Sequence, residues 1–323
     1  NEAGAMSSWM AAATAYSHYG IPMLPFFIFY SMFGFQRIGD LAWAAGDMRA
    51  RGFLLGATSG RTTLNGEGLQ HEDGHSQIQA QLIPNCRSYD PAFACELAVI
   101  MQRGAQAMLE EQEDAFYYIT LMNENYRHIA LPKGAEENIL RGMHRIGESK
   151  MKKPKARARL IGGGAILQEV IAAAALLEND FGVAADLYSA TSFNMLARNG
   201  HDCARWNALH SDQKPKTPDA ETILSGGAAG EDSPVIAATD YIRMYADQIR
   251  AFIPARYAIL GTDGFGRSDT RWNLRRHFEV DRHAVALAAL FALSQDGKLP
   301  AKTAKEAAKK YNINPDAPNP LGV

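Results

Sequence analysis

Short apolar runs alternate with stretches of helical spacing along the chain. In the first half, apolar runs occupy residues 23–30, 52–58 and 115–122, while residues 2–20 and 35–51 place apolar side chains on one face of a helix. A buried strand is a short continuous apolar run, whereas an amphipathic helix repeats apolar positions every three or four residues. The pattern therefore predicts strands and helices in alternation, which favours a mostly parallel sheet covered on both faces.

The second half repeats this alternation. Strands are predicted at 159–163, 184–189, 234–239 and 257–262, helices at 165–180, from Ser192 and from Tyr241, and a loop at 211–232, where Pro, Gly and Ala are frequent. The chain is therefore predicted to be α/β, with two three-layer units that each contain a mostly parallel sheet.

Prolines and glycines mark the predicted ends of elements. Gly20 and Pro22 end the first helix, and Asp90-Pro91 predicts a helix start, with an acidic N-cap before a proline. Residues 133–158 end in a run of lysine and arginine. Such a run could bind phosphate backbones, but without interleaved aromatic residues it is more often a solvated linker. The predicted divisions are thus 1–132, 133–158 and 159–323.

Composition narrows the class of protein. The 323 residues suffice for two domains, and 47% hydrophobic with 21% charged residues is the balance of a soluble globular protein. A formal net charge of −2 gives no reason to expect nucleic acid or an anionic membrane as partner. Cys86, Cys95 and Cys203 form no disulfide or metal-binding pattern, which indicates a reducing, cytoplasmic setting. No apolar run reaches the roughly 20 residues needed to span a bilayer.

Residues 60–75 carry the candidate chemistry. This segment holds four glycines, whose backbone freedom allows close approach to a ligand. It also holds five side chains that move protons or bind cations near neutral pH, which are Glu67, His71, Glu72, Asp73 and His75. A segment that only connected two elements would not need so many titratable groups.

Two other interpretations of this segment remain open on the residues alone. His71-Glu72-Asp73-Gly74-His75 satisfies the H-E-x-x-H pattern of zinc hydrolases. That pattern requires a helix, so that both imidazoles lie on one face, and Gly74 opposes a helix here. The segment could also be a solvated polar loop. The glycine-rich runs 162–164 and 261–266 are weak signals for phosphate binding, because they lack the spacing of the known phosphate loops.

Three runs of sequence, residues 29–40, 58–75 and 260–269, resemble the homodimeric bacterial pyruvate dehydrogenases. The resemblance covers nearly the whole chain and implies a transketolase-like fold. It makes residues 1–132 an N-terminally incomplete thiamine pyrimidine-binding domain, and residues 159–323 a transketolase C-terminal-like domain. The implied activity is the thiamine-diphosphate-dependent oxidative decarboxylation of pyruvate, followed by reductive acetylation of a lipoyl group on the dihydrolipoyl acetyltransferase of the same multienzyme complex.

The resemblance also assigns roles to particular residues. Glu2 would contact a ring nitrogen of the aminopyrimidine, and Phe33 would pack on that ring. Tyr30 and His71 would line the reaction centre, with Glu67 beside them. A carboxyl in an apolar pocket has a raised pKa, which is expected of Glu2. Taken alone, Glu2 is better explained as a carboxylate stabilised by a helix dipole, and Phe33 as a core residue.

The resemblance assigns a role in the site less securely to several further residues near these motifs. Gln36, His75 and Asn125 could each be a hydrogen-bonded structural residue, and Arg37 is expected to be a surface or interface cation.

The sequence lacks one part of the expected coenzyme site. The family holds the diphosphate and its Mg²⁺ through a Gly-Asp-Gly…Asn signature, and no such signature occurs here. The chain starts without an initiator methionine, so it is expected to begin within a larger polypeptide. The diphosphate and metal would then be held by the missing N-terminal region of the partner subunit. The C-terminal half is expected to serve dimer packing, and a non-catalytic dimerisation or scaffold fragment remains the alternative.

Overall fold

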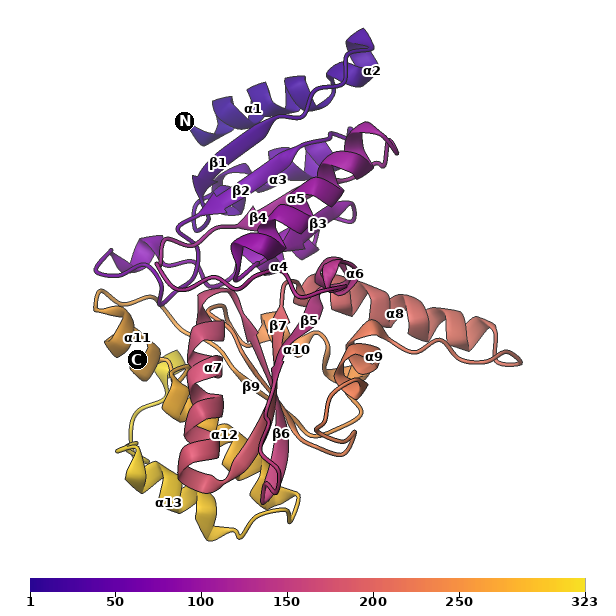
Figure 1. Cartoon of the computed structure of the whole chain (residues 1–323). Coiled ribbons are helices and arrows are strands. Elements are labelled where there is room, and N and C mark those ends of the chain that lie inside the picture. The colour runs from indigo at the N-terminus through magenta and orange to yellow at the C-terminus, as the bar shows by residue number, and fades with distance from the viewer. Residues whose placement is uncertain (323) are drawn as a thin grey trace.

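The computed structural model describes residues 1–322, which form two α/β units stacked end to end (Figure 1). The first unit contains a four-stranded sheet in the order β1-β2-β4-β3. Its strands are β1 (Phe26–Tyr30), β2 (Phe53–Ala57), β3 (Cys86–Tyr89) and β4 (Phe116–Thr120), and all three pairings are parallel. The second unit contains a five-stranded sheet in the order β5-β7-β6-β8-β9.

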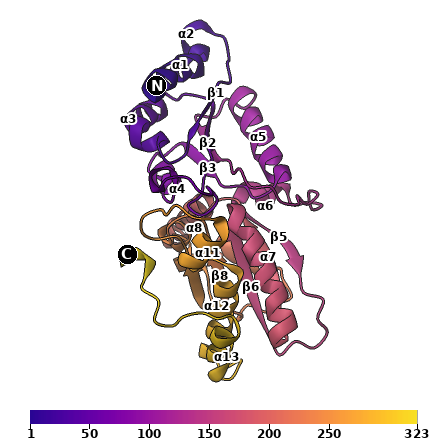
Figure 2. The same ribbon diagram turned by 90° about the vertical axis from the view of Figure 1, so that its left-hand side faces the viewer.

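Helices cover both faces of the first sheet (Figure 2). The helices of this unit are α1 (Glu2–Ala13), α2 (Ala15–Tyr19), α3 (Gly34–Asp47), α4 (Ser76–Gln81), α5 (Ala94–Leu109) and α6 (Glu136–Arg141). On one face, Met6 and Trp9 of α1 and Ile38 of α3 pack on Leu54 and Tyr118. On the other face, α5 and α6 cover Phe53 and Tyr117. Alternate residues of β2 and β4 point to opposite faces, and nearly all of them are buried because both faces are covered.

The second sheet is mostly parallel. Its strands are β5 (Met143–Glu148), β6 (Ala156–Gly163), β7 (Val183–Ala190), β8 (Val235–Ala238) and β9 (Tyr257–Leu260). Only the edge strand β5 runs antiparallel to its neighbour. The helices are α7 (Leu167–Leu176), α8 (Phe193–Leu209), α9 (Asp219–Ser225), α10 (Met244–Asp247), α11 (Arg271–His277), α12 (Arg282–Gln295) and α13 (Lys302–Lys310). Short helical turns occur at Leu69–His71, Gly164–Ile166, Leu177–Phe181, Arg250–Phe252 and Pro320–Gly322.

Two cores hold the second unit together. α7 and α12 pack on one face of the sheet, where Val170, Leu290 and Leu293 are fully buried. α8, α9 and α10 cover the other face through Phe193, Leu224 and Tyr245. The prediction of two α/β units with mostly parallel sheets is therefore confirmed.

Some local predictions differ from the structure. The helix expected over 2–20 is interrupted at Thr14, whose hydroxyl bonds back to the Met10 carbonyl at 2.8 Å. Asp90-Pro91 does not start a helix, because α5 begins at Ala94 and is capped by Glu96, whose carboxylate accepts from the Ala92 and Phe93 backbone N–H groups.

Other segments contain elements that the pattern did not predict. The segment 133–158, expected to be a linker, contains α6 and the edge strand β5, and α9 lies within the loop expected at 211–232. β3, α4 and the three helices α11, α12 and α13 were also not predicted. The division into domains at 132 and 159 stays a prediction.

No helix within residues 1–322 combines the length and apolarity that crossing a bilayer requires.

Candidate active site

The candidate residues come from neighbouring parts of the first unit. Glu2 lies in the first turn of α1, Tyr30 is the last residue of β1, and Phe33 lies just before α3. Glu67 and His71 belong to the segment 60–75, which follows β2. Carboxyl ends of parallel strands lie at one edge of a sheet, and this edge is the usual place for a ligand in α/β proteins. The fold therefore gathers the five residues at one edge of the first sheet.

Three of these side chains form an aromatic cluster. The ring centres of His71 and Phe33 are 5.1 Å apart, those of His71 and Tyr30 5.5 Å, and those of Tyr30 and Phe33 6.1 Å. The Tyr30 side chain is 48% exposed, so this cluster is open to a ligand. The Nδ1 atom of His71 is buried without a hydrogen-bond partner and lies 3.8 Å from Oε2 of Glu67. That separation allows an ion pair but is too long for a hydrogen bond.

Glu2 has a partner that the sequence did not predict. Its carboxylate forms an ion pair with Arg37, and the Arg37 guanidinium lies 4.2 Å from the centre of the Phe33 ring. Hydrogen bonds from its own backbone N–H and from Arg37 lower the pKa of Glu2. The expectation of a raised pKa in an apolar pocket is therefore wrong for this structure, because the carboxylate lies at a helix start beside a cation. Arg37 is an exposed cation, as expected.

Of the three residues whose role was less secure, two lie next to the aromatic cluster and one does not. Gln36 Nε2 and His75 Nε2 lie 2.9 Å apart and form a hydrogen bond next to the cluster. Asn125 is exposed in the loop after β4, and within the described part of the chain no contact joins it to the cluster.

The H-E-x-x-H segment does not form the helix that a zinc site requires. Leu69–His71 is a single helical turn, and α4 begins only at Ser76. Asp73 caps α4 by accepting from the backbone N–H groups of His75 and Ser76 at 3.0 and 2.9 Å. His71 and His75 are therefore not one turn apart on a common helix. Among residues 1–322, no group of three His, Cys, Asp or Glu side chains could hold a metal.

The segment 60–75 is held in place by the second unit. Asp240, which follows β8, accepts from the Thr62 backbone N–H at 2.9 Å and from the Thr62 and Thr63 hydroxyls at 2.7 Å. The guanidinium of Arg61 donates to the Thr262 carbonyl at 2.7 Å. Gly60 has a φ of 91°, and a Cβ there would lie 2.3 Å from Asp240 Oδ2. Sequence reasoning missed these contacts because they join residues nearly 200 positions apart.

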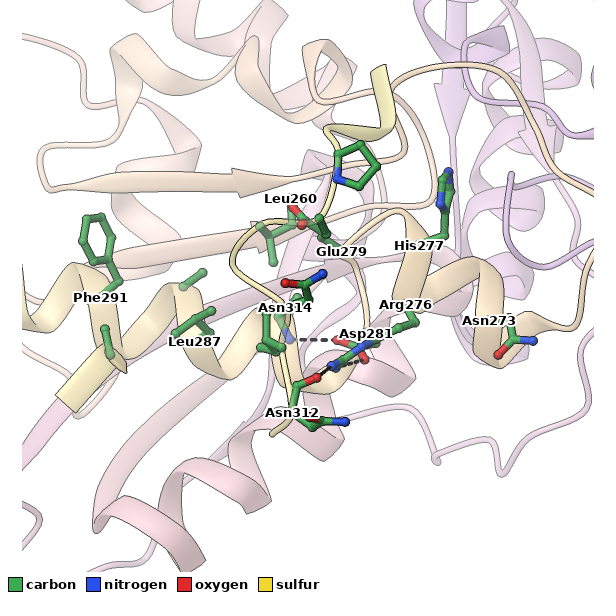
Figure 3. Close-up of a pocket in the computed structure, with 16 residues that line it drawn as sticks. Leu260, Asn273, Arg276, His277, Glu279, Asp281, Leu287, Phe291, Asn312 and Asn314 are labelled. Carbon is green, nitrogen blue, oxygen red and sulfur yellow. Dashed lines mark hydrogen bonds and ion pairs between the residues drawn. The ribbon is translucent and has the colours of Figure 1, made fainter. Parts of the chain in front are cut away.

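A pocket of the second unit is a different site. A cavity of about 760 Å³ lies among α11, α12 and the segment that follows α13 (Figure 3). Leu287 and Phe291 of α12 form an apolar wall, while His277 and Asn314 contribute polar atoms. Burial lowers the pKa of His277. None of the cluster residues lines this cavity, so the candidate chemistry does not belong to it.

Family models and sequence relatives match this chain. Residues 1–129 match the family model for the pyruvate dehydrogenase E1 component middle domain, and residues 142–281 match that for the transketolase-like C-terminal domain. The pyruvate dehydrogenase E1 component of Pseudomonas aeruginosa is 61% identical over 322 residues, which cover 99% of this chain and 36% of that protein. That of Escherichia coli is 54% identical over 322 residues, which cover 99% of this chain and 35% of that protein.

Solved structures show the same fold at low identity. Transketolase from Campylobacter jejuni has a TM-score of 0.62 at 16% identity, covering 86% of this chain and 37% of that one. The inactive β4 tetramer of a split-gene transketolase has a TM-score of 0.60 at 14% identity, covering 91% of this chain and 82% of that one. The chain spans about a third of the length of the curated relatives it matches. The fold is therefore transketolase-like.

Proposed function

The chain belongs to the family of pyruvate dehydrogenase E1 components, and from this we propose that its candidate site takes part in the thiamine-diphosphate-dependent oxidative decarboxylation of pyruvate. The acetyl group would pass to a lipoyl group on the dihydrolipoyl acetyltransferase of the same complex. The single observation that carries the proposal is the open cluster of Tyr30, Phe33 and His71, with a carboxylate at its edge.

The cluster fits the aminopyrimidine part of the coenzyme. The Phe33 ring lies against the flat guanidinium of Arg37, so a flat nitrogen heterocycle could stack at the same place. Glu2 is paired with the same Arg37 guanidinium and would accept or share a proton at a ring nitrogen once Arg37 releases it. Thiamine diphosphate, when bound, supplies the carbanion chemistry that loss of carbon dioxide from a 2-oxo acid requires.

The remaining residues would act on the substrate. His71 has an unpaired Nδ1 and could hold a proton near the carboxylate or carbonyl of pyruvate. Glu67, 3.8 Å away, would orient that imidazole. The Tyr30 hydroxyl would orient the substrate carboxylate. Together these roles make the chain the aminopyrimidine and substrate side of the site.

The other side of the site would come from outside this chain. Its relatives are about three times as long, and we place the groups that hold the diphosphate and Mg²⁺ in the N-terminal part of the relatives' length, supplied by a second subunit. This chain would then be inactive alone. Cys86, Cys95 and Cys203 carry free thiols, which agrees with the reducing cytoplasm as the proposed location.

Reconstitution tests this proposal. We expect pyruvate decarboxylation, followed with an artificial electron acceptor, only when the chain is joined to the N-terminal two-thirds of a bacterial relative and supplied with thiamine diphosphate and Mg²⁺. In this complete enzyme, His71→Ala should lower kcat by about 100-fold and leave coenzyme affinity nearly unchanged. Turnover by the chain alone would contradict the proposed division of the site. Lack of turnover by the complete enzyme would favour a dimerisation or scaffold role.

A further inference from the structure

Glu72 follows His71 directly and is fully buried. Its Oε2 accepts a hydrogen bond of 2.7 Å from the backbone N–H of Arg267, which lies 195 positions further along the chain. Its Oε1 has no hydrogen-bond partner. Burying a carboxyl with a single hydrogen bond costs free energy of folding. Packing alone therefore does not explain a glutamate at this position.

The loop between β9 and α11 lies along the segment that carries Glu67 and His71. The Ser268 hydroxyl donates to the Glu67 carbonyl, and the Gly66 N–H donates to the Asp269 carbonyl at 3.0 Å. The Glu72 contact with Arg267 is a further link, as is the hydrogen bond from Arg61 to the Thr262 carbonyl. The backbone on both sides of His71 is therefore tied to the second unit.

Packing at this place leaves no free space. A Cβ on Gly266 would lie 2.5 Å from Oε2 of Glu72 and 2.8 Å from the carbonyl oxygen of Leu69. Only glycine at position 266 lets the loop approach the turn that contains Leu69 and His71. The close approach and the Glu72 hydrogen bond are therefore parts of one arrangement.

The Glu72 carboxyl can stay buried and keep its hydrogen bond with Arg267 because it is mostly uncharged. Burial raises its pKa to about 8, and Asp240 acts in the same direction, whereas the Arg267 N–H and Arg61 lower it. At neutral pH the carboxyl is mostly protonated, so its burial does not leave a bare charge. A neutral carboxyl still accepts a hydrogen bond from a backbone N–H. Glutamine, which has the same shape and no charge, can make the same contact.

We propose that Glu72 is a positioning residue, which through the Arg267 backbone holds the turn that carries Glu67 and His71 in its working geometry. This inference rests on the proposed function, because it assumes that Glu67 and His71 act on the substrate. It gives the second unit a part in the site besides packing. A displacement of about 1 Å in a catalytic group can cost roughly 100-fold in rate, so loss of a buried contact next to His71 should lower kcat.

The test compares Glu72→Ala, Glu72→Gln and Glu96→Ala in the complete enzyme. Glu96 is the matched control, because it is also a fully buried glutamate that accepts from backbone N–H groups, and its partners are Ala92, Phe93 and His144. We expect Glu72→Ala to lower kcat by about 10- to 100-fold with coenzyme affinity unchanged. Glu72→Gln should retain most of the rate, and Glu96→Ala should lose stability but keep kcat.

Amide hydrogen exchange gives a readout that does not depend on activity. Exchange of residues 66–71 should become at least about ten-fold faster in Glu72→Ala and stay near normal in Glu72→Gln and Glu96→Ala. Gly266→Ala disturbs the same contact from the other side, and it should reproduce the loss of kcat and the faster exchange. It also serves as the test if Glu72→Ala does not fold.

Distinct outcomes separate this inference from the proposed function. Normal exchange and normal kcat in both Glu72→Ala and Gly266→Ala would overturn the positioning role. An equal loss of kcat in Glu96→Ala would overturn it too, because the effect would then reflect general destabilisation. A normal kcat in His71→Ala would overturn the proposed function instead, whatever the exchange rates show.

Discussion

Glu2 shows how one contact changes the chemistry expected of a side chain. Its place in the chain predicted a helix-start carboxylate, and the family resemblance predicted a contact with the coenzyme. The structure pairs it with Arg37, 35 positions away, and the same guanidinium covers the Phe33 ring. In the proposed function the coenzyme must displace Arg37 from both groups. An exposed ion pair is a weak competitor, since solvent screens it.

Removing Arg37 should therefore favour coenzyme binding. We expect Arg37→Gln in the complete enzyme to tighten thiamine diphosphate binding by roughly two- to five-fold, because the competing ion pair and cation–π contact are lost. Tryptophan fluorescence quenching or calorimetry would measure the dissociation constant. Arg243→Gln is a suitable control, because Arg243 is a similarly exposed arginine paired with Asp263 in the second unit. Weaker binding in Arg37→Gln would mean that Arg37 contacts the coenzyme itself.

Removal of the Glu2 carboxylate should slow coenzyme activation. In the complete enzyme, Glu2→Ala should lower the rate of proton exchange at the thiazolium carbon by at least about 100-fold, because no group would share a proton with the ring nitrogen. Exchange into heavy water, followed by NMR, measures this rate. Glu2 is partly exposed and not in a core, so the unfolding midpoint should hardly move. An unchanged exchange rate would remove Glu2 from the mechanism.

Helix α5 and helix α3 show why element ends are hard to predict. Asp90-Pro91 has the residue types of a helix start, but Asp90 accepts from the Thr120 hydroxyl at 2.6 Å, and Glu96 caps α5 in its place. The choice between two acceptors depends on what lies nearby in space. Helix α3, in contrast, was predicted by apolar spacing with its start within one residue, although it ends at Asp47 and not at Arg51.

Two glycines of α3 should respond in opposite directions to alanine. A Cβ on Gly34 would lie 2.0 Å from the buried Phe29 ring, whereas nothing lies within 4 Å of a Cβ on Gly39. We expect Gly34→Ala to destabilise the chain by about 1–3 kcal/mol through overpacking. Gly39→Ala should stabilise it by about 0.5–1 kcal/mol, because alanine loses less backbone entropy in a helix. Urea denaturation of both variants measures the difference, and equal effects would contradict this packing.

The contact between the two units contains several buried acids. Asp90 of the first unit is almost fully buried and accepts from the Tyr241 hydroxyl of the second unit at 3.3 Å. Burial raises its pKa to about 7, and Asp240 and Asp73 act in the same direction, whereas the hydroxyls of Thr120 and Tyr241 lower it. The stability of the whole chain should therefore depend on pH through this contact.

The sign of this dependence follows from the raised pKa. The unfolded chain releases the Asp90 proton near pH 4, whereas the folded chain keeps it up to about pH 7. Between these pH values the folded chain binds one proton more than the unfolded chain. The free energy of unfolding therefore falls as pH rises, by about 1.4 kcal/mol per pH unit. Asp90→Asn should remove this slope. Its free energy of unfolding, relative to the wild type, should rise between pH 4 and 7 and then level off; parallel curves would contradict the assignment.

Local sequence was sufficient to predict many of the helices and strands, while the membership of the candidate site stays a prediction. Apolar spacing depends on neighbours within a few residues, so it predicted α3, β2, β4 and most of the second sheet. The motifs that place Tyr30, Phe33, Glu67 and His71 are equally local. β3 and α4 were missed because they are short and, in part, polar.

Only the tertiary structure decided the partners and ionisation of the charged residues. The contacts of Glu2 with Arg37, Glu72 with Arg267 and Asp90 with Tyr241 join residues 35, 195 and 151 positions apart. No local pattern encodes such contacts, because they arise from the path of the chain through two packed units. The pKa of a carboxyl depends on its burial and on the charges around it. Both are properties of the folded molecule, and this is why the same residue type is ionised at Glu2 and mostly protonated at Glu72.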